Sequence, residues 1–497
     1  MTTSRLALLT AVVVALVGLS SWWGGSPAAE PSGSGNESIP GIGSSDTLSS
    51  TWYCAVGTAG VDLPSVHEVL LANPTDSEIQ VRLTAYAAEG ALPSQMVSAA
   101  ASDVTAIDVN TIFAATDLSV MAESSSGTLA VEHRLEASTA ADSVPCATSS
   151  SDTWFFPSQS TVTGASAKLV LFNPFSADAG VDITAAVSDG LRAPPQLAGI
   201  VVPAGSSRVI DLAEAAERRD QFAVSVKLRT GRVVAETSQT FAIVADDATG
   251  TPAQRGLRLQ LGVPEAQSDW TFATGFTGPG VTEKVVVYNP NRASARVVVQ
   301  VTPFGAAALP PEPFELDVPP NRYAVIDMSA ETRIPTEGFH SIVVESSPDV
   351  PVVVARTIQL SGAPAAPADP AVGVRPNQTL GSTIGTATPI LAARWLLPGI
   401  LTGADQQPMV FVHNPGSGIV TVTVTALMGA EPQIEVVRDL EVGAGDSRWI
   451  SLATPELLAV DDVAFRVEAS APVAVERTDT FAAENDLSVG LAVPYLG

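Results

Sequence analysis

The chain has 497 residues, of which 46% are hydrophobic, 15% charged and 5% aromatic, and its formal net charge is −27 at pH 7. Binding to nucleic acid or to an anionic membrane surface needs clustered Lys and Arg, so the charge and the scarcity of lysine (Lys168, Lys227 and Lys284 only) argue against both partners. The 37 prolines and 38 glycines favour short strands joined by turns, and the length suggests three to five domains.

The first residues form a short apolar segment. Arg5 precedes an uncharged stretch from Leu6 to Leu19, and a positive charge on this side predicts that the rest of the chain crosses the membrane. Residues 1–26 are therefore interpreted as either a cleavable signal peptide or a membrane anchor, which would span the 18 residues from Leu6 to Trp23. Residues 27–50, rich in Ser, Gly and Pro, are predicted to be a flexible linker.

Four segments of the remaining sequence repeat one pattern. Each opens with a tryptophan and continues to an apolar strand that ends in Asn-Pro; the tryptophans are Trp52, Trp154, Trp270 and Trp395, and the asparagines are Asn73, Asn173, Asn289 and Asn414. The spacing from Trp to Asn is 21, 19, 19 and 19 residues. The repeat therefore predicts four domains, at residues 51–148, 152–265, 268–390 and 393–497.

The downstream half of each unit repeats as well. In the second unit, residues 212–220 are expected to form one or two helical turns, and residues 222–226 and 233–236 to follow as strands in hairpin order. Many short strands within roughly 100 residues are typical of a two-sheet antiparallel sandwich. The predicted fold is all-β, with four tandem immunoglobulin-like antiparallel β-sandwich domains after the N-terminal hydrophobic segment. The alternative is a large β-propeller to which each unit supplies two blades.

The repeated residues have structural interpretations. A tryptophan on the first strand is expected to close one end of a sandwich core, with a sugar-stacking position as the alternative. Asn followed by Pro is expected to close a turn. The last strand carries Glu132, Glu236 or Glu476 in three units, whereas the third unit has Ala355. We expect these glutamates to be exposed or bonded within turns.

The two cysteines both belong to the first unit. Cys54 lies two residues after the first tryptophan and Cys146 lies at the end of the same unit. Since an export signal implies an oxidising compartment, a disulfide between them is predicted. Two cysteines alone make neither a zinc site nor a redox pair, so we interpret the bond as structural.

No catalytic or metal-ligating constellation emerges from the sequence. Nucleophile elbows and phosphate-binding glycine loops are absent, and four histidines occur at no metal-ligand spacing: His67, His133, His340 and His413. The acidic pairs Asp246-Asp247 and Asp461-Asp462 lack the spacing of a calcium loop and are interpreted as solvated turns. The sequence predicts no cofactor, no metal and no catalytic residue, and hence a protein that is not an enzyme.

The apolar N-terminal segment, the Trp-Tyr-Cys at residues 52–54, the four Trp and Asn-Pro units and the Lys-poor composition resemble an actinobacterial family of secreted or membrane-anchored proteins of unknown function. The units are also similar to the tandem immunoglobulin-like modules of bacterial surface proteins. The resemblance covers nearly the whole chain. Since the family has no established activity, it implies an extracytoplasmic location, anchored at the N-terminus or secreted, and no site residues.

Three functions are compatible with this pattern. The first is a non-enzymatic extracytoplasmic cell-envelope protein that acts as a structural or protein-interaction scaffold, binding an envelope protein and touching the membrane only through an uncleaved N-terminal segment. The second is a cell-wall glycan-binding protein with wall polysaccharide as its partner; Trp449, outside the repeated set, is its candidate ligand-binding residue. The third, a carbohydrate-active enzyme, requires carboxylates from different units to converge. Function is expected where the units differ, as in the Pro- and Ala-rich insertion at 361–376.

Overall fold

A computed structural model describes residues 39–44, 47–57, 65–113, 115, 118–246, 248, 252–305, 310–361, 380–403, 405–429, 432–460 and 462–496. The predicted signal peptide or anchor, most of the predicted linker and nearly all of the insertion at 361–376 lie outside these residues. None of the helices in the described part of the chain has the length and apolar character needed to cross a bilayer.

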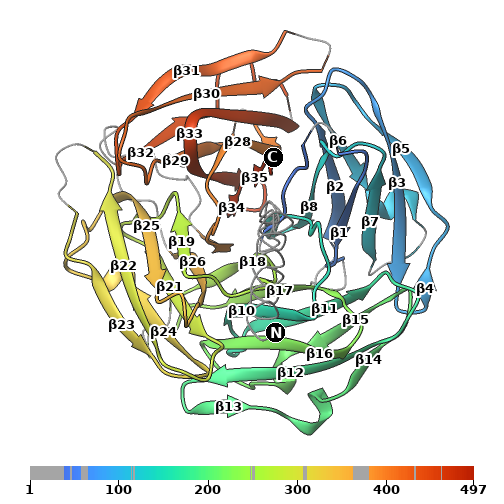
Figure 1. Ribbon diagram of the computed structural model, residues 1–497, viewed down its shortest axis with the longest axis vertical. Coiled ribbons are helices and arrows are strands. Elements are labelled where there is room, and N and C mark those ends of the chain that lie inside the picture. Colours follow the sequence, from blue (N-terminus) through green and yellow to red (C-terminus); the bar gives the residue numbers. More distant parts are fainter. Residues whose placement is uncertain are drawn as a thin grey trace, which may run out of the picture. The chain divides into compact units, whose positions relative to one another are not determined.

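The described chain folds into paired antiparallel sheets, which we number as sandwiches 1 to 4 in chain order (Figure 1). In sandwich 1, one sheet has the order β1-β7-β3-β4, with β5 also on β3: β1 (Ser50–Cys54), β7 (Ser119–Ser124), β3 (Ile79–Ala87), β4 (Gly90–Ala91) and β5 (Gln95–Ala99). The other has the order β6-β2-β8-β9: β6 (Asp103–Asp108), β2 (Ser65–Asn73), β8 (Ala130–Ala137) and β9 (Ala140–Pro145). A one-turn helix, α2 (Val109–Ile112), follows β6.

Sandwich 2 repeats this arrangement. One sheet contains β10 (Thr153–Gln159), β16 (Phe222–Thr230), β12 (Ala179–Val187), β13 (Gly190–Arg192) and β14 (Ile200–Val202). The other contains β15 (Ser206–Asp211), β11 (Ala165–Asn173), β17 (Val234–Ile243) and β18 (Gln254–Leu261). The 3-10 turns are η2 (Pro195–Leu197) and η3 (Leu212–Glu214), and η3 is the regular helical element within the predicted 212–220 segment.

Sandwich 3 has the same two sheets. The first holds β19 (Asp269–Phe272), β25 (Gly338–Ser346), β22 (Ala295–Pro303), β23 (Phe314–Val318) and β20 (Phe276–Thr277). The second holds β24 (Arg322–Asp327), β21 (Val281–Asn289), β26 (Val353–Ser361) and β27 (Leu380–Thr386), and the 3-10 turn η4 (Met328–Ala330) follows β24.

In sandwich 4, one strand belongs to both sheets. The 20-residue β33 (Asp462–Phe481) pairs through its first half with β28 (Ala392–Leu401) and β30 (Val420–Leu427), which carry β35 (Val493–Pro494) and β31 (Ile434–Val442). Its second half pairs with β29 (Met409–His413) and β34 (Asp486–Leu491), and β32 (Ser447–Ser451) completes that sheet.

The expected hairpin between residues 222–226 and 233–236 is wrong. β16 pairs with β10 and β12, whereas β17 pairs with β11 and β18 in the facing sheet. The chain changes sheets between the two strands, at Gly231, whose φ of 76° favours glycine. Crossing from one sheet to the other lets both strands contribute apolar side chains to the same core.

Each core forms because alternating residues of the two sheets face one another. The strand β22, for example, buries Ala295, Val297 and Val299 and exposes the residues between them. The all-β prediction with antiparallel sandwiches is therefore confirmed.

The four sandwiches pack against one another through apolar interfaces. Apolar clusters join the core of sandwich 2 to Ala55 and Val56 of sandwich 1, and the core of sandwich 3 to Phe155 of sandwich 2. Sandwich 1 also packs against sandwich 4 through Leu396 and Ala464, so its neighbours are both the second and the fourth (Figure 1). The last strand of the second sheet in each sandwich, β9, β18, β27 or β34, contacts its counterparts in both neighbouring sandwiches. We call these four the closing strands.

Candidate functional site

The most deeply buried charged side chains lie where two sandwiches meet. Glu132 on β8, Glu236 on β17 and Glu476 on β33 occupy equivalent register positions, opposite Leu70, Val170 and Phe411 respectively. All three are at most 2% exposed. The expectation that these glutamates are exposed or bonded within turns is wrong, because each reaches into a neighbouring sandwich.

Glu236 of sandwich 2 binds sandwich 1. Its Oε2 accepts hydrogen bonds of 3.0 Å from the backbone N–H groups of Ala55 and Val56, and its Oε1 lies 2.7 Å from Nε2 of His133. The ring of His133 meets His67 edge-on at 5.5 Å, and burial lowers the pKa of His67 well below its ordinary value. Burial therefore favours the neutral form of His67.

Glu476 of sandwich 4 binds sandwich 3 in the same way. Its Oε1 lies 3.1 Å from Nη2 of Arg356, and its Oε2 accepts a 2.7 Å hydrogen bond from the backbone N–H of Thr274. Burial raises the pKa of Glu476 to about 7, although the Arg356 charge and the N–H donor act in the opposite direction. Arg356 also lies over the ring of Phe272, with 4.7 Å between the guanidinium carbon and the ring centroid.

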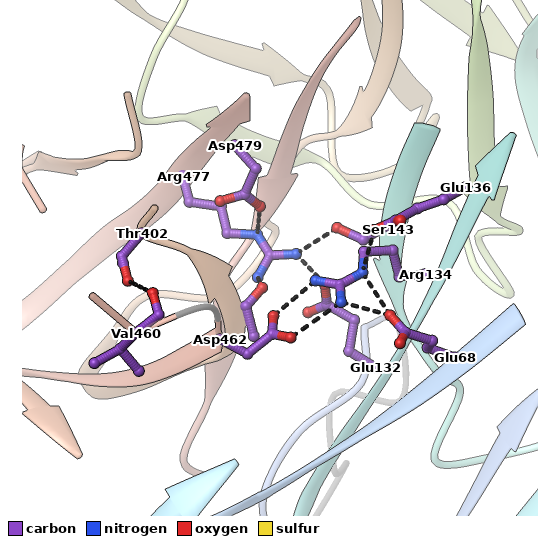
Figure 2. A network of polar contacts seen from close by, with 11 residues as sticks. Glu68, Glu132, Arg134, Glu136, Ser143, Thr402, Val460, Asp462, Arg477 and Asp479 are labelled. Atoms are coloured by element: carbon purple, nitrogen blue, oxygen red, sulfur yellow. Dashed lines mark hydrogen bonds and ion pairs between the residues drawn. The ribbon is translucent and has the colours of Figure 1, made fainter. Parts of the chain in front are cut away.

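Glu132 of sandwich 1 completes the set by pairing with Arg477 of sandwich 4 (Figure 2). The same guanidinium donates to Oγ of Ser143 at 2.9 Å and lies 2.9 Å from Oδ2 of Asp479. Burial raises the pKa of Asp479 to about 7, and Arg477 opposes that shift. The arginine thus ties together carboxylates from two different sandwiches.

Arg134 forms a second cation site at the same junction (Figure 2). Its guanidinium contacts Glu68 and Glu136 of sandwich 1 at 3.0 and 2.9 Å, and Asp462 of sandwich 4 at 2.7 Å. Asp462, expected in a solvated turn, instead begins β33 and has a side chain only 17% exposed. The expectation is wrong for this residue because its partner comes from another unit. Asp461 lies outside the described residues.

The three carboxylate contacts follow one rule. Each glutamate binds the residue that follows the equivalent position in the sandwich it contacts: Glu236 binds His133, Glu476 binds Arg356, and Glu132 binds Arg477. Between sandwiches 2 and 3 the corresponding residues are Ala355 and Thr237. Both members of this pair are uncharged, so the missing ion pair leaves no unpaired charge at these two positions.

Asp486 occupies the meeting point of the closing strands. Its Oδ2 accepts hydrogen bonds from the backbone N–H groups of Ala141 and Leu257, and its Oδ1 accepts from Ser382 and Leu487. The donor distances are 3.1, 3.0, 2.9 and 2.9 Å. Burial raises the pKa of Asp486 to about 7, while the four N–H donors, one from each closing strand, favour its ionised form.

Small residues make room for this carboxylate. The positions equivalent to Asp486 hold Ala140, Gly256 and Gly381. A Cβ on Gly381 would lie 2.9 Å from Oδ1 of Asp486, and one on Gly256 would lie 2.5 Å from the Ser382 nitrogen. One carboxylate therefore serves four strands because the other three sandwiches supply no side chain beyond a methyl group.

The repeated tryptophans and asparagines lie inside the sandwiches. The four tryptophans are at most 1% exposed, which places them in cores and away from any sugar-stacking surface. Each repeated asparagine closes its turn in the same way. Its Nδ2 donates to the carbonyl of the fourth residue along and to the carbonyl that ends a later strand, and its Oδ1 accepts from the N–H two residues along: Asn73, Asn173, Asn289 and Asn414.

The predicted disulfide between Cys54 and Cys146 is confirmed, and both half-cystines are buried. Trp449, the candidate glycan-binding residue, is half-buried on β32 and packs beside the apolar cluster that contains Phe411. Asp246 is exposed, while Asp247 is outside the described residues. Across the described residues, no group of three or more His, Cys, Asp or Glu side chains is placed to hold a metal ion.

Comparison with known proteins adds a family of unknown function. Residues 131–250 match the model of that family, DUF5719, from the last strands of sandwich 1 into sandwich 2. This match supports part of the expected resemblance. A search of curated protein sequences found no match.

Solved structures show only weak similarity to the chain. It shares 17% identity with Thermotoga maritima 1070, over 25% of this chain and 95% of that one, with a TM-score of 0.20. It shares 23% identity with the Anabaena sensory rhodopsin transducer, over 18% of this chain and 88% of that one, with a TM-score of 0.16. It shares 10% identity with the FN1–FN3 domains of chicken CNTN1, over 69% of this chain and 99% of that one, with a TM-score of 0.10. Scores this low carry no argument about function.

Proposed function

We propose that the protein is a non-enzymatic extracytoplasmic protein of the cell envelope, in which the packed β-sandwiches form a rigid structural or protein-interaction scaffold. One observation carries the proposal: the carboxylates that converge from different sandwiches are already bound by arginine, histidine or backbone N–H groups. Glu132, Glu236, Glu476 and Asp486 hold neighbouring sandwiches together. The hydrogen bonds and ion pairs of these carboxylates serve the packing of one sandwich on the next.

The raised pKa values of Glu476 and Asp479 have a structural cause. A carboxyl group that titrates near neutral pH is also found in general acid-base catalysis. Such a group needs access to a substrate, however, and these side chains are at most 2% exposed. Neither lines the cavity between sandwiches 2 and 3 or the cavity around Leu259, Ile384 and Val489 of the closing strands. Burial between sheets accounts for both shifts, which supports the non-enzymatic proposal.

The disulfide supports the proposed location. A bond between Cys54 and Cys146 persists in oxidising compartments and is rare in the cytosol of mesophiles. An envelope location, through a retained anchor or by secretion, agrees with it. N-terminal sequencing of the protein purified from its native cells distinguishes an uncleaved anchor from a cleaved signal peptide.

Affinity capture of the full chain from envelope extract tests the scaffold role. We expect one or a few envelope proteins to be retained by the wild type, and no retention of the chain on isolated cell wall. Retention on wall polysaccharide that is lost in Trp449→Ala would favour glycan binding instead. Release of reducing sugar from wall material, abolished by Glu476→Gln in a variant of unchanged stability, would contradict the non-enzymatic proposal.

A further inference from the structure

A polar cavity lies between sandwiches 2 and 3, at the junction that lacks the repeated ion pair. Its volume is about 150 Å³, and its walls come from β17 and β18 on one side and from β21 and β26 on the other. A cavity of this volume accommodates a ligand with a single six-membered ring. The structure therefore leaves space at the one junction where Ala355 and Thr237 replace charged partners.

The residues at this position differ between sandwiches 1 and 3. In sandwich 1, Arg134 faces Glu68 across the strand pair, and its guanidinium reaches Asp462 of sandwich 4. The equivalent pair in sandwich 3 is Thr357 and Lys284. The long arginine is replaced by a short threonine, and the carboxylate by an ammonium group. The wall of the cavity therefore carries a cation where sandwich 1 carries a carboxylate.

Arg258 supplies a second cation to this cavity. It is 8% exposed, its guanidinium carbon lies 4.4 Å from the ring centroid of Phe241, and its Nε donates to Oγ of Ser382 at 2.6 Å. Burial lowers the pKa of Arg258 to about 10, which leaves the side chain charged at neutral pH. Among the described residues no carboxylate hydrogen-bonds this guanidinium. A buried cation without an anion in contact is destabilising, and a bound anion would relieve that cost.

The nearby acids do not provide that anion. Asp142 and Asp486 act on Arg258 only through space, and their oxygens are occupied by backbone N–H groups, such as that of Leu259 at 2.7 Å from Asp142. Asp220 lines the cavity but is exposed, so solvent screens its charge. Lys284, also on the cavity wall, forms no ion pair within the described part of the chain.

The rest of the wall favours hydroxyl groups. Ser160, Thr282 and Thr357 line the cavity, and so do the amides of Gln254 and Gln359. The Gln359 Nε2 donates to the Leu360 and Gly381 carbonyls, whereas its Oε1 is a buried acceptor without a donor in the structure. A ligand hydroxyl is the kind of donor that this oxygen lacks.

We propose that this cavity binds a single acidic sugar unit, with its carboxylate between Lys284 and Arg258 and its hydroxyl groups on the serine, threonine and glutamine side chains. Two cations on the wall, Lys284 and the buried Arg258, favour an anionic ligand, and the hydroxyl and amide groups beside them favour one that carries hydroxyl groups. This binding role goes beyond the scaffold function and does not depend on it.

Isothermal titration calorimetry of the full chain at low ionic strength tests the site. The probes are glucuronate, glucose, glucose 6-phosphate and inorganic phosphate. We expect glucuronate to bind and glucose to bind at least about tenfold more weakly, since a hydrogen bond to a charged group contributes about 1.5–3 kcal/mol. Lys284→Gln should weaken glucuronate about tenfold or more, and Thr357→Leu should weaken it by filling the cavity. The matched control is Lys168→Gln, at the equivalent position in sandwich 2, where Lys168 lies 3.3 Å from Asp211.

The alternative outcomes are distinct. Equal binding of glucuronate and glucose, or unchanged affinity in Lys284→Gln, would overturn the proposal. Tighter binding of inorganic phosphate or glucose 6-phosphate than of glucuronate would overturn the carboxylate assignment. Because Arg258 is buried and its replacement risks unfolding, the test rests on Lys284 and Thr357, whose variants are first compared with the wild type in thermal unfolding.

Discussion

Glu476 of sandwich 4 and Arg356 of sandwich 3 form an ion pair in which neither side chain is more than 1% exposed. Two other junctions carry equivalent contacts, between Glu236 and His133 and between Glu132 and Arg477. Buried ion pairs contribute little net stability compared with apolar packing, but breaking one leaves a charge without compensation. These contacts therefore favour one relative position of two neighbouring sandwiches, since any other packing would separate the charged partners.

Replacing Arg356 alone should lower the free energy of unfolding more than replacing both Arg356 and Glu476. We expect Arg356→Met to lower the free energy of unfolding by about 3–5 kcal/mol, because Glu476 then remains buried without its cation. The double variant Arg356→Met with Glu476→Gln should recover a large part of that loss. Urea unfolding of the wild type, the two single variants and the double variant gives the coupling energy. Strictly additive losses would show that the two side chains do not act as a pair.

Replacing Asp486 should lower the free energy of unfolding strongly, because one carboxylate accepts hydrogen bonds from four strands. In Asp486→Gly the four N–H groups of Ala141, Leu257, Ser382 and Leu487 lose their acceptor, and each unsatisfied buried donor costs about 1–3 kcal/mol. We expect a loss of at least about 3 kcal/mol in denaturant unfolding. The exposed Asp317→Gly serves as the control for loss of an aspartate.

A small anion should restore part of this stability. The glycine variant leaves the donors of four strands around an empty carboxylate position, where formate matches the missing group. We expect formate to raise the melting temperature of Asp486→Gly more than that of the wild type at equal ionic strength. An identical response of both proteins would mean that the four donors do not form an anion-binding position.

Much of the fold follows from local pattern, whereas the junctions do not. The Trp and Asn-Pro repeat predicts sandwiches because a core tryptophan and a turn-closing asparagine act within their own unit. The partner of Glu132 is Arg477, 345 residues along the chain, and no local rule connects them. Alternation of apolar and polar residues could not show it either, since β8 and the second half of β33 are buried on both faces.

One signal was nevertheless present in the sequence. The residue after each repeated glutamate position is His133, Thr237, Arg356 or Arg477, and the uncharged Thr237 is matched by the uncharged Ala355 in the next unit. When two residues from consecutive units are both uncharged where the other units have charged residues, the pattern indicates that the two positions are in contact. Asp486 offered a weaker sign, namely that its equivalents are alanine or glycine. The cavity beside Lys284 had no sequence signal, because its shape depends on how two sandwiches dock.

The disulfide should stabilise sandwich 1 through the unfolded state. The bond joins residues separated by 92 positions, and closing a loop of that length contributes up to about 4–5 kcal/mol in the chain-entropy model. We expect the double variant Cys54→Ser with Cys146→Ser to lower the free energy of unfolding by up to about 4–5 kcal/mol, and hence to lower the urea midpoint. The wild type under non-reducing conditions is the reference. Mass spectrometry that finds free thiols in the native protein would contradict the bond.

The repeated asparagines should be intolerant of change. Asn289 donates to the carbonyls of Ala293, Val318 and Pro319 and accepts from the N–H and the side-chain amide of Asn291, so Asn289→Ala removes five hydrogen bonds of a buried side chain. We expect a loss of about 2–4 kcal/mol in denaturant unfolding. The control Asn321→Gly should be neutral or slightly stabilising, because Asn321 has a φ of 52° that glycine adopts without strain. Equal effects of the two changes would show that Asn289 is not a structural residue.

Stability should fall as the pH rises from about 4 to about 7. Burial raises the pKa values of Glu476, Asp479 and Asp486 to about 7, whereas the unfolded chain has carboxyl groups of ordinary pKa near 4. Between these values the three carboxyl groups bind more protons in the folded protein than in the unfolded chain, so their contribution to the free energy of unfolding decreases with pH. The buried His67 and His413, with lowered pKa values, contribute a slope of the opposite sign. Each group contributes a slope of up to about 1.4 kcal/mol per pH unit. Urea unfolding at closely spaced pH values measures the slope, and Asp479→Asn should flatten it, because an amide cannot ionise. A slope that is the same in the wild type and in Asp479→Asn would show that Asp479 is not protonated in the folded protein.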